Sequence, residues 1–206
     1  MMKLFHAWGS CSLASLIALE EAGADYQLAV ISTKDGDQRR PDYLAVNPKG
    51  RVPALVTERG VLTETPAILA FIAQSYPQAR LAPLDDLFAF ARMQAFNSYL
   101  CSTVHVAHAH KHRGYRWASE ASSFEDMRRK VAQNEIDCFR LIETEVLDGP
   151  WVMGEQFTVA DGYLFTLAGW LEGDGVDIRQ FPKVHAHWER TRERPAVRKV
   201  LALEPA

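Results

Sequence analysis

The chain has 206 residues, 48% of them hydrophobic and 24% charged, so it is long enough to build one or two cores without a metal or a disulfide. Its net charge is −3, and its acidic and basic residues are interspersed, so the sequence shows no basic segment that would bind nucleic acid. No apolar run approaches about 18 residues and no signal-peptide pattern is present, so we expect no membrane partner and a cytoplasmic protein. The three cysteines lack metal or C-x-x-C spacing, which fits a reducing compartment.

The first part of the chain mixes strand and helix signals. Residues 3–7 alternate like a strand, Ser10 can cap a helix that stops at Gly23, and residues 26–31 read as a second strand. Residues 54–57 and 61–63 flank a short turn as a hairpin, and a helix is expected over residues 66–75. This βαβ, ββα order predicts a thioredoxin-like domain, which we assign to residues 1–80.

The rest of the chain, residues 81–206, is predicted to be an all-helical domain, because prolines and aspartates break the pattern between residues 76 and 86. Helices are expected over residues 88–112, 124–146, 159–171, 184–192 and 196–203. The Thr158-Val159-Ala160-Asp161 sequence has the spacing of a capping box at a helix start, and we interpret it as support for folding. The predicted fold class is therefore α/β followed by all-α.

Two short motifs predict a ligand site. Val52-Pro53 enters an apolar strand, and a cis peptide costs only about 0.5–1 kcal/mol before proline, so the Val52 backbone can be offered to a ligand. Glu64-Thr65-Pro66 has the pattern of a helix start, with Thr65 as N-cap, and helix starts bind anions. The two together suit a peptide that carries both an amino group and a carboxylate.

The order of the Leu4-Phe5 strand, the Ser10-Cys11-Ser12 turn, residues 47–55 and Glu64-Thr65 resembles the glutathione-binding domain of the soluble glutathione transferases. The cysteine makes the chain similar to the bacterial beta class, and the resemblance runs from about residue 3 to about residue 200. It implies a glutathione S-transferase that acts in detoxification, with glutathione as co-substrate, no metal, a homodimeric assembly, and a helical domain that holds a small electrophile.

The resemblance also implies which residues hold glutathione. They are Lys34 and Arg51 for the glycyl carboxylate, Val52 with Pro53 for the cysteinyl backbone, Glu64 and Thr65 for the γ-glutamyl end, and Ser98 and Ser102, which would reach across from the partner subunit. Lys49 is interpreted as a surface residue.

Cys11 is the main candidate for the chemistry. It lies where helix N–H groups point outward, so we expect its pKa to fall below the usual value of about 8.5. The resemblance implies that Cys11 faces the sulfur of glutathione, as a hydrogen-bond donor or in a mixed disulfide. Ser10 and Ser12 are alternatives, because other classes of the family use serine or tyrosine in this loop. A buried, inert cysteine is the other interpretation, and it is the one preferred for Cys101 and Cys138.

His105 is the second candidate, because the resemblance implies a histidine near the sulfur at this point of the first long helix. The family has a lysine next, whereas this chain has Val106. His105, His108 and His112 share one helical face with His110 to the side, which suits a pocket wall, a solvated stripe or, less well, a zinc site. The following residues 115–117 either pack over the domain interface or line the acceptor pocket.

Two other functions stay open at this point. A glutathione-dependent thiol-disulfide oxidoreductase or peroxidase would use Cys11 as a nucleophile, although Ala14 stands where a resolving cysteine would be. A non-catalytic glutathione-transferase-like binding protein would keep the scaffold, but the glutathione motifs are retained. The motifs identify neither the electrophile nor the dominant reaction, because fold resemblance does not assign a substrate.

Overall fold

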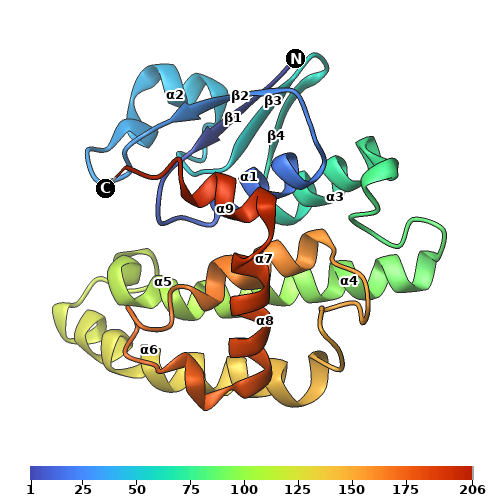
Figure 1. Cartoon of the computed structure of the whole chain (residues 1–206). Coiled ribbons are helices and arrows are strands. Elements are labelled where there is room, and N and C mark those ends of the chain that lie inside the picture. Colours follow the sequence, from blue (N-terminus) through green and yellow to red (C-terminus); the bar gives the residue numbers. More distant parts are fainter. Residues whose placement is uncertain (206) are drawn as a thin grey trace.

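The computed structural model describes residues 1–205 and shows a four-stranded mixed sheet joined to a helical part (Figure 1). The strand order is β2-β1-β3-β4, with β2 parallel to β1, and with β3 antiparallel to β1 and β4. The elements of the sheet part are β1 (Met2–His6), α1 (Ser12–Glu21), β2 (Tyr26–Val30), α2 (Pro41–Val46), β3 (Ala54–Thr57), β4 (Gly60–Thr63) and α3 (Thr65–Ser75). The predicted fold class is confirmed.

Helix α2 was not predicted, because its six residues are too few to show a helical period. It nevertheless shapes the loop that precedes β3. The Tyr43 hydroxyl and the Asn47 side-chain amide both donate to the Arg51 carbonyl, each at 2.6 Å, and both side chains are buried. This pair of hydrogen bonds fixes the backbone immediately before Val52.

The helical part follows α3 and largely agrees with the predicted helices. Its elements are α4 (Leu87–Tyr99), α5 (His105–Arg113), α6 (Ala121–Leu141), α7 (Val159–Ala168), α8 (Pro182–Arg192) and α9 (Pro195–Leu201). A π-helical turn, Leu100–Val104, joins α4 to α5, and a second, Ile142–Val146, follows α6, so each pair forms one of the predicted long helices. Every described helix is too short or too polar to cross a membrane.

Most predicted boundaries differ from the structure by one to three residues. Cys11, not Ser10, occupies the N-cap position of α1, and Glu64, not Thr65, occupies that of α3. Helix α7 ends three residues earlier than predicted, at Ala168. The division of the chain at residue 80 stays a prediction; beyond the turn Pro77–Ala79 the chain already contacts the helical part, where Val159 N donates to Leu81 O at 2.9 Å.

Helix α7 lies at the centre of the molecule, and all of its residues are buried (Figure 1). Helix α1 packs directly against it, and α9 packs against α1 from the C-terminal end of the chain. Gly162 permits this close approach, because a Cβ there would lie 3.2 Å from the Ile17 side chain. The sheet part and the helical part are therefore joined by a tight contact between α1 and α7.

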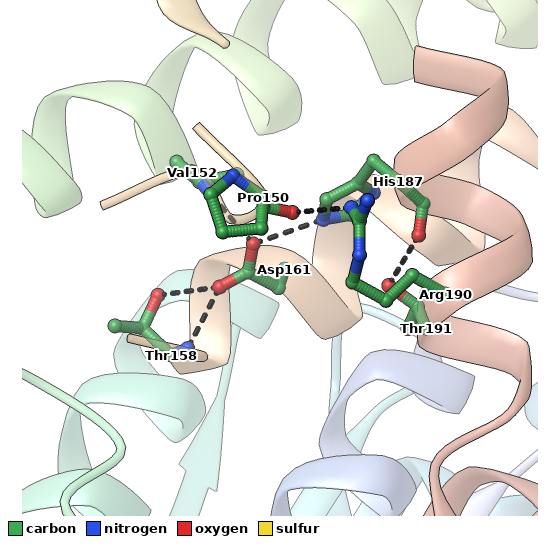
Figure 2. A network of polar contacts seen from close by, with 7 residues as sticks. All are labelled: Pro150, Val152, Thr158, Asp161, His187, Arg190 and Thr191. Carbon is green, nitrogen blue, oxygen red and sulfur yellow. Dashed lines mark hydrogen bonds and ion pairs between the residues drawn. The ribbon is translucent and has the colours of Figure 1, made fainter. Parts of the chain in front are cut away.

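A buried carboxylate fixes the start of α7 (Figure 2). Asp161 Oδ2 accepts from the Thr158 backbone N–H at 2.7 Å and from the Thr158 hydroxyl at 3.0 Å. Its Oδ1 accepts from Val152 N at 2.7 Å and lies 2.9 Å from His187 Nε2, which is on α8. The predicted capping box is confirmed. Asp161 also ties the preceding loop and α8 to the same point.

We predict that Asp161→Ala lowers the free energy of unfolding by about 3–5 kcal/mol, because four buried donors lose a charged acceptor. Thr158→Val should cost only about 1 kcal/mol, since the backbone bond to Asp161 remains. Urea denaturation measures both. As a control, Asp126→Ala removes an exposed acid that pairs with Arg129 and should stay within about 0.5 kcal/mol of the parent. A loss below about 1 kcal/mol in Asp161→Ala would contradict the assigned role.

Candidate functional site

A cleft of about 400 Å³ opens between the sheet part and α5. One wall consists of the turn after β1, the loop before β3 and the start of α3. The other consists of α5, the turn after it, Tyr163 and Trp170. The cleft brings together these predicted site residues: Ser10, Cys11, Arg51, Val52, Pro53, Glu64, Thr65 and His105.

The Val52-Pro53 peptide bond is cis. The Val52 carbonyl faces the turn after β1, where it accepts a hydrogen bond from Cys11 Sγ at 3.5 Å. Arg51, one residue earlier, has its carbonyl occupied by Tyr43 and Asn47, and its side chain is exposed at the cleft. The backbone around Val52 is thus held in a defined position beside the Cys11 thiol.

Glu64 and Thr65 form one end of the cleft. Glu64 has φ of 72°, a backbone conformation that non-glycine residues seldom adopt and that clusters at functional sites. Its carboxylate pairs with Lys49 Nζ at 2.7 Å, and Lys49 also donates to the Thr63 hydroxyl at 2.6 Å. Thr65 is buried beside it at the start of α3. Lys49 is exposed, as interpreted, but its pairing with Glu64 was missed because the two residues meet only through the fold.

The prediction that the pKa of Cys11 falls is wrong. The Cys11 side chain is only 8% exposed, and this burial raises the pKa of the thiol to about 11, although hydrogen bonding from Thr65 and the charge of Arg113 oppose the shift. At neutral pH Cys11 is therefore in its thiol form. Desolvation outweighs the helix N-terminus here, so Cys11 is a hydrogen-bond donor rather than an anion.

The two serines beside Cys11 differ in position. Ser10 lines the cleft, and its hydroxyl donates to the Ala7 carbonyl at 2.7 Å. Ser12 is fully buried below the turn, where its hydroxyl lies 2.7 Å from His6 Nδ1 and accepts from Ala7 N at 3.1 Å. Burial lowers the pKa of His6 to about 4, so this contact is between neutral groups. Ser12 holds the turn on β1 and does not present its hydroxyl to the cleft.

Three predicted glutathione contacts also lie outside this cleft. Lys34 is exposed on the loop after β2, and its neighbour Thr33 lines the cleft instead. Ser98 and Ser102 are exposed on α4 and the π-helical turn, where the Ser102 hydroxyl donates to the Ser98 carbonyl at 2.8 Å. A role for these serines in the site of a partner subunit stays a prediction.

His105 faces the cleft as a neutral ring. Burial, followed by the charges of Arg113 and other nearby cations, lowers the pKa of His105 to about 4. The imidazole packs edge-on against Trp170, with ring centroids 5.1 Å apart. At physiological pH it can therefore donate or accept a hydrogen bond but supplies no positive charge.

The other histidines form part of the same wall. His108 stacks on Trp170 at 4.3 Å, and its Nδ1 lies 2.5 Å from Asp174. His112 lines the cleft as well, whereas His110 packs against Trp117. The interpretation as a pocket wall is thus confirmed for His105, His108 and His112. Within residues 1–205, no group of histidines, cysteines and acids is arranged to hold a metal ion.

Several lining residues were not predicted as a site. Arg39, Arg113, Tyr163 and Trp170 all reach the cleft, and the three residues after Gly114, whose role was left open, line it too. Tyr163 is fully buried, and its hydroxyl has no hydrogen-bond partner among the described residues. In the sequence Tyr163 lies inside an apolar helix, which indicates core packing and gives no signal of a site.

Comparison with known proteins agrees with this geometry. Residues 1–74 match the family model of the glutathione S-transferase N-terminal domain, and residues 105–195 match that of the C-terminal domain. The glutathione S-transferase GstA of Escherichia coli O157:H7 is 32% identical over 206 residues, which cover 98% of each chain.

Solved structures extend the similarity to the whole fold. A glutathione transferase homologue from Sulfitobacter with bound glutathione is 45% identical, with a TM-score of 0.95 over 98% of this chain and 97% of that one. A bacterial beta class glutathione S-transferase from Sphingomonas chungbukensis is 35% identical, with a TM-score of 0.85 over 97% of each chain. The chain belongs to the glutathione S-transferase family.

Proposed function

We propose that the protein is a glutathione S-transferase that binds glutathione on the sheet wall of the cleft and holds a small electrophile against the helical wall. The observation that carries this proposal is the position of the Cys11 thiol, which lies between the Val52 carbonyl on one side and the α5 wall on the other. A sulfur bound beside Cys11 would lie where the two walls meet.

The polar groups of the sheet wall match those of glutathione from end to end. The ammonium of the γ-glutamyl group pairs with the Glu64 oxygen that Lys49 leaves free, and its carboxylate binds the Thr65 hydroxyl and the first N–H groups of α3. The cysteinyl backbone bonds to Val52, as a strand bonds to a sheet edge. The glycyl carboxylate points toward Arg51, whose guanidinium has no acid partner among the described residues.

The chemical step is the attack of the glutathione thiolate on an electrophilic carbon. The glutathione thiol first releases its proton to solvent water, and each unit by which the site lowers the pKa of that thiol requires about 1.4 kcal/mol of preferential thiolate binding. The Cys11 thiol is protonated at neutral pH and can donate a hydrogen bond to the thiolate, together with N–H groups at the start of α1. The S–C bond then forms as the electron pair moves to the leaving group or to an enolate.

The alternative functions receive less support. A thiol-disulfide oxidoreductase needs an exposed, acidic cysteine, whereas the Cys11 thiol is buried and its pKa is raised to about 11. A binding protein without activity is not favoured either, because relatives that match nearly the whole chain are named as transferases. We place the enzyme in the cytoplasm, where its three free cysteines are compatible with a reducing environment.

We also propose that the enzyme is a homodimer in which the exposed Ser98 and Ser102 reach the glutathione site of the partner subunit. Analytical ultracentrifugation at micromolar concentration should give twice the mass of the 23.2 kDa chain. A monomer under these conditions would remove both the assembly and the role of the two serines.

We predict that Thr65→Ala and Glu64→Gln each weaken glutathione binding by about ten- to a hundredfold, because one charged hydrogen bond is worth about 1.5–3 kcal/mol. Calorimetry measures the affinity, and thermal unfolding should show a much smaller effect on the fold. Glu58→Gln is the matched control, since Glu58 is an exposed acid on the adjacent hairpin that pairs with the N-terminus. Unchanged affinity in both site variants would remove the γ-glutamyl assignment.

We predict that Cys11→Ala keeps conjugating activity within about tenfold of the parent, because the N–H groups at the start of α1 remain as donors, but that it no longer forms a mixed disulfide with glutathione. Alkylation of Cys11 in the parent should speed up about tenfold per pH unit between pH 7 and 9, since the raised pKa keeps the reactive thiolate scarce below about pH 11.

Mass spectrometry locates both modifications. Cys101→Ala is the control variant, because Cys101 is half-buried and lines the same cleft, contrary to the buried position expected for it. An adduct confined to Cys101 or Cys138 would show that the reactive position is not Cys11. Loss of conjugation together with loss of the disulfide would instead make Cys11 the nucleophile for every activity.

A further inference from the structure

The cleft is strongly cationic although the chain as a whole carries a net charge of −3. Four arginines line it, Arg39, Arg51, Arg113 and Arg116, against the single acid Glu64. Glu64 is already paired with Lys49. Within residues 1–205, none of the four guanidiniums lies within ion-pair distance of a carboxylate. A concave site with unpaired charges of one sign attracts ligands of the opposite sign.

The arginines divide between the two walls. Arg39 and Arg51 belong to the sheet part, where the proposed position of the glycyl carboxylate of glutathione lies against Arg51. Arg113 ends α5, and Arg116 lies in the short 3-10 turn Gly114–Arg116 that follows. They stand on the wall assigned to the electrophile, so glutathione leaves their charge without a partner.

The fold holds both arginines of the helical wall over the cleft. They flank Gly114, which is buried against α6, and a Cβ at this position would lie 3.1 Å from Phe124 and 3.2 Å from the Met127 sulfur. The backbone of the turn therefore rests directly on α6. A cation at a helix C-terminus is favourable without any ligand, and Arg113 gains this stabilisation at the end of α5, whereas Arg116 lies beyond the helix.

The charges of these arginines already act on one another. Burial lowers the pKa of Arg116, and the charges of Arg51 and Arg113 lower it further. Arg113 and Arg116 also contribute to the lowered pKa of His105, which leaves that ring neutral. Like charges held together without a counter-ion destabilise the free cleft, and a bound anion would relieve that repulsion.

We infer that the electrophile accepted by this cleft carries a carboxylate, which Arg113 and Arg116 hold on the helical wall. This inference rests on the proposed transferase function and specifies its substrate class. The guanidinium fork suits a carboxylate, which it can bind through two parallel hydrogen bonds. The exposed rings of Tyr115 and Trp117 line the cleft beside the arginines and provide flat surfaces for an unsaturated or aromatic substrate.

The test compares two acceptors that differ in one charge, 4-chloro-3,5-dinitrobenzoate and its methyl ester. In both, the glutathione thiolate attacks the carbon that bears chlorine, the C–S bond forms, and chloride leaves with the bonding electrons. The parent enzyme should accelerate the acid at least tenfold more than the ester, each relative to its uncatalysed rate. In the double variant Arg113→Gln/Arg116→Gln this preference should disappear, because the KM for the acid rises. The KM for the ester and the KM for glutathione should each change less than about twofold.

Binding of the two glutathione conjugates gives a readout that does not depend on turnover. By calorimetry, the acid conjugate should bind the parent at least tenfold more tightly than the ester conjugate, and the double variant should bind both alike. Arg113→Lys/Arg116→Lys should restore part of the difference. Arg140→Gln is the matched control, because Arg140 is exposed on α6 and pairs with Asp137 away from the cleft.

Three results would overturn the inference. An equal loss with acid and ester would mean that the arginines support the thiolate or the fold, and a rise in the glutathione KM would assign them to glutathione. A parent enzyme that conjugates the ester without preferring the acid would refute the substrate class and leave the transferase function intact. Absence of catalysis with both acceptors, together with equal binding of both conjugates, would reject the inference and the proposed function together.

Discussion

The contact between α1 and α7 is the constraint on which the rest of the structure depends. Helix α1 begins beside Cys11, and α7 carries Tyr163 on the opposite wall of the cleft, so the distance between these helices sets the distance between the walls. Gly162 makes the contact possible because a side chain there would meet Ile17. Asp161, the preceding residue, fixes the start of α7 through the loop and α8. Two adjacent residues therefore position α7: Gly162 through packing and Asp161 through hydrogen bonds.

Burial also decides the charge state of the groups around the reacting sulfur. The start of a helix favours a thiolate, but the apolar surroundings of Cys11 disfavour any charge, and the second effect is larger. The same desolvation, with neighbouring cations, keeps His105 neutral. The positive charge of the cleft therefore comes from arginines, whose guanidinium stays protonated even when partly buried. Cys11 and His105 are left as neutral hydrogen-bonding groups.

The sequence by itself determined the order of the elements and the positions of the local motifs. Alternating and helical periods are local properties, so the strands and the long helices could be predicted to within a few residues. The capping box of Thr158 and Asp161 and the Val52-Pro53 turn depend on residues that are close in the chain, and both appear as expected. Helix α2 could not be predicted, because its six residues are too few to show the helical repeat of apolar residues.

Only the tertiary structure decided which side chains share the cleft and what charge they carry. Ser12 was a candidate beside Cys11, but its hydroxyl points toward His6 instead of the cleft. The direction in which each side chain of a short turn points cannot be predicted from the spacing of residues in the sequence. Lys49 pairs with Glu64, and Arg113 lines the same cleft as the start of α3, because the fold brings distant parts of the chain together. The pKa of Cys11 depends on how many atoms surround the sulfur. The physical reason is the same in each case, because burial and charge are set by neighbours in space, whereas a sequence motif records neighbours along the chain.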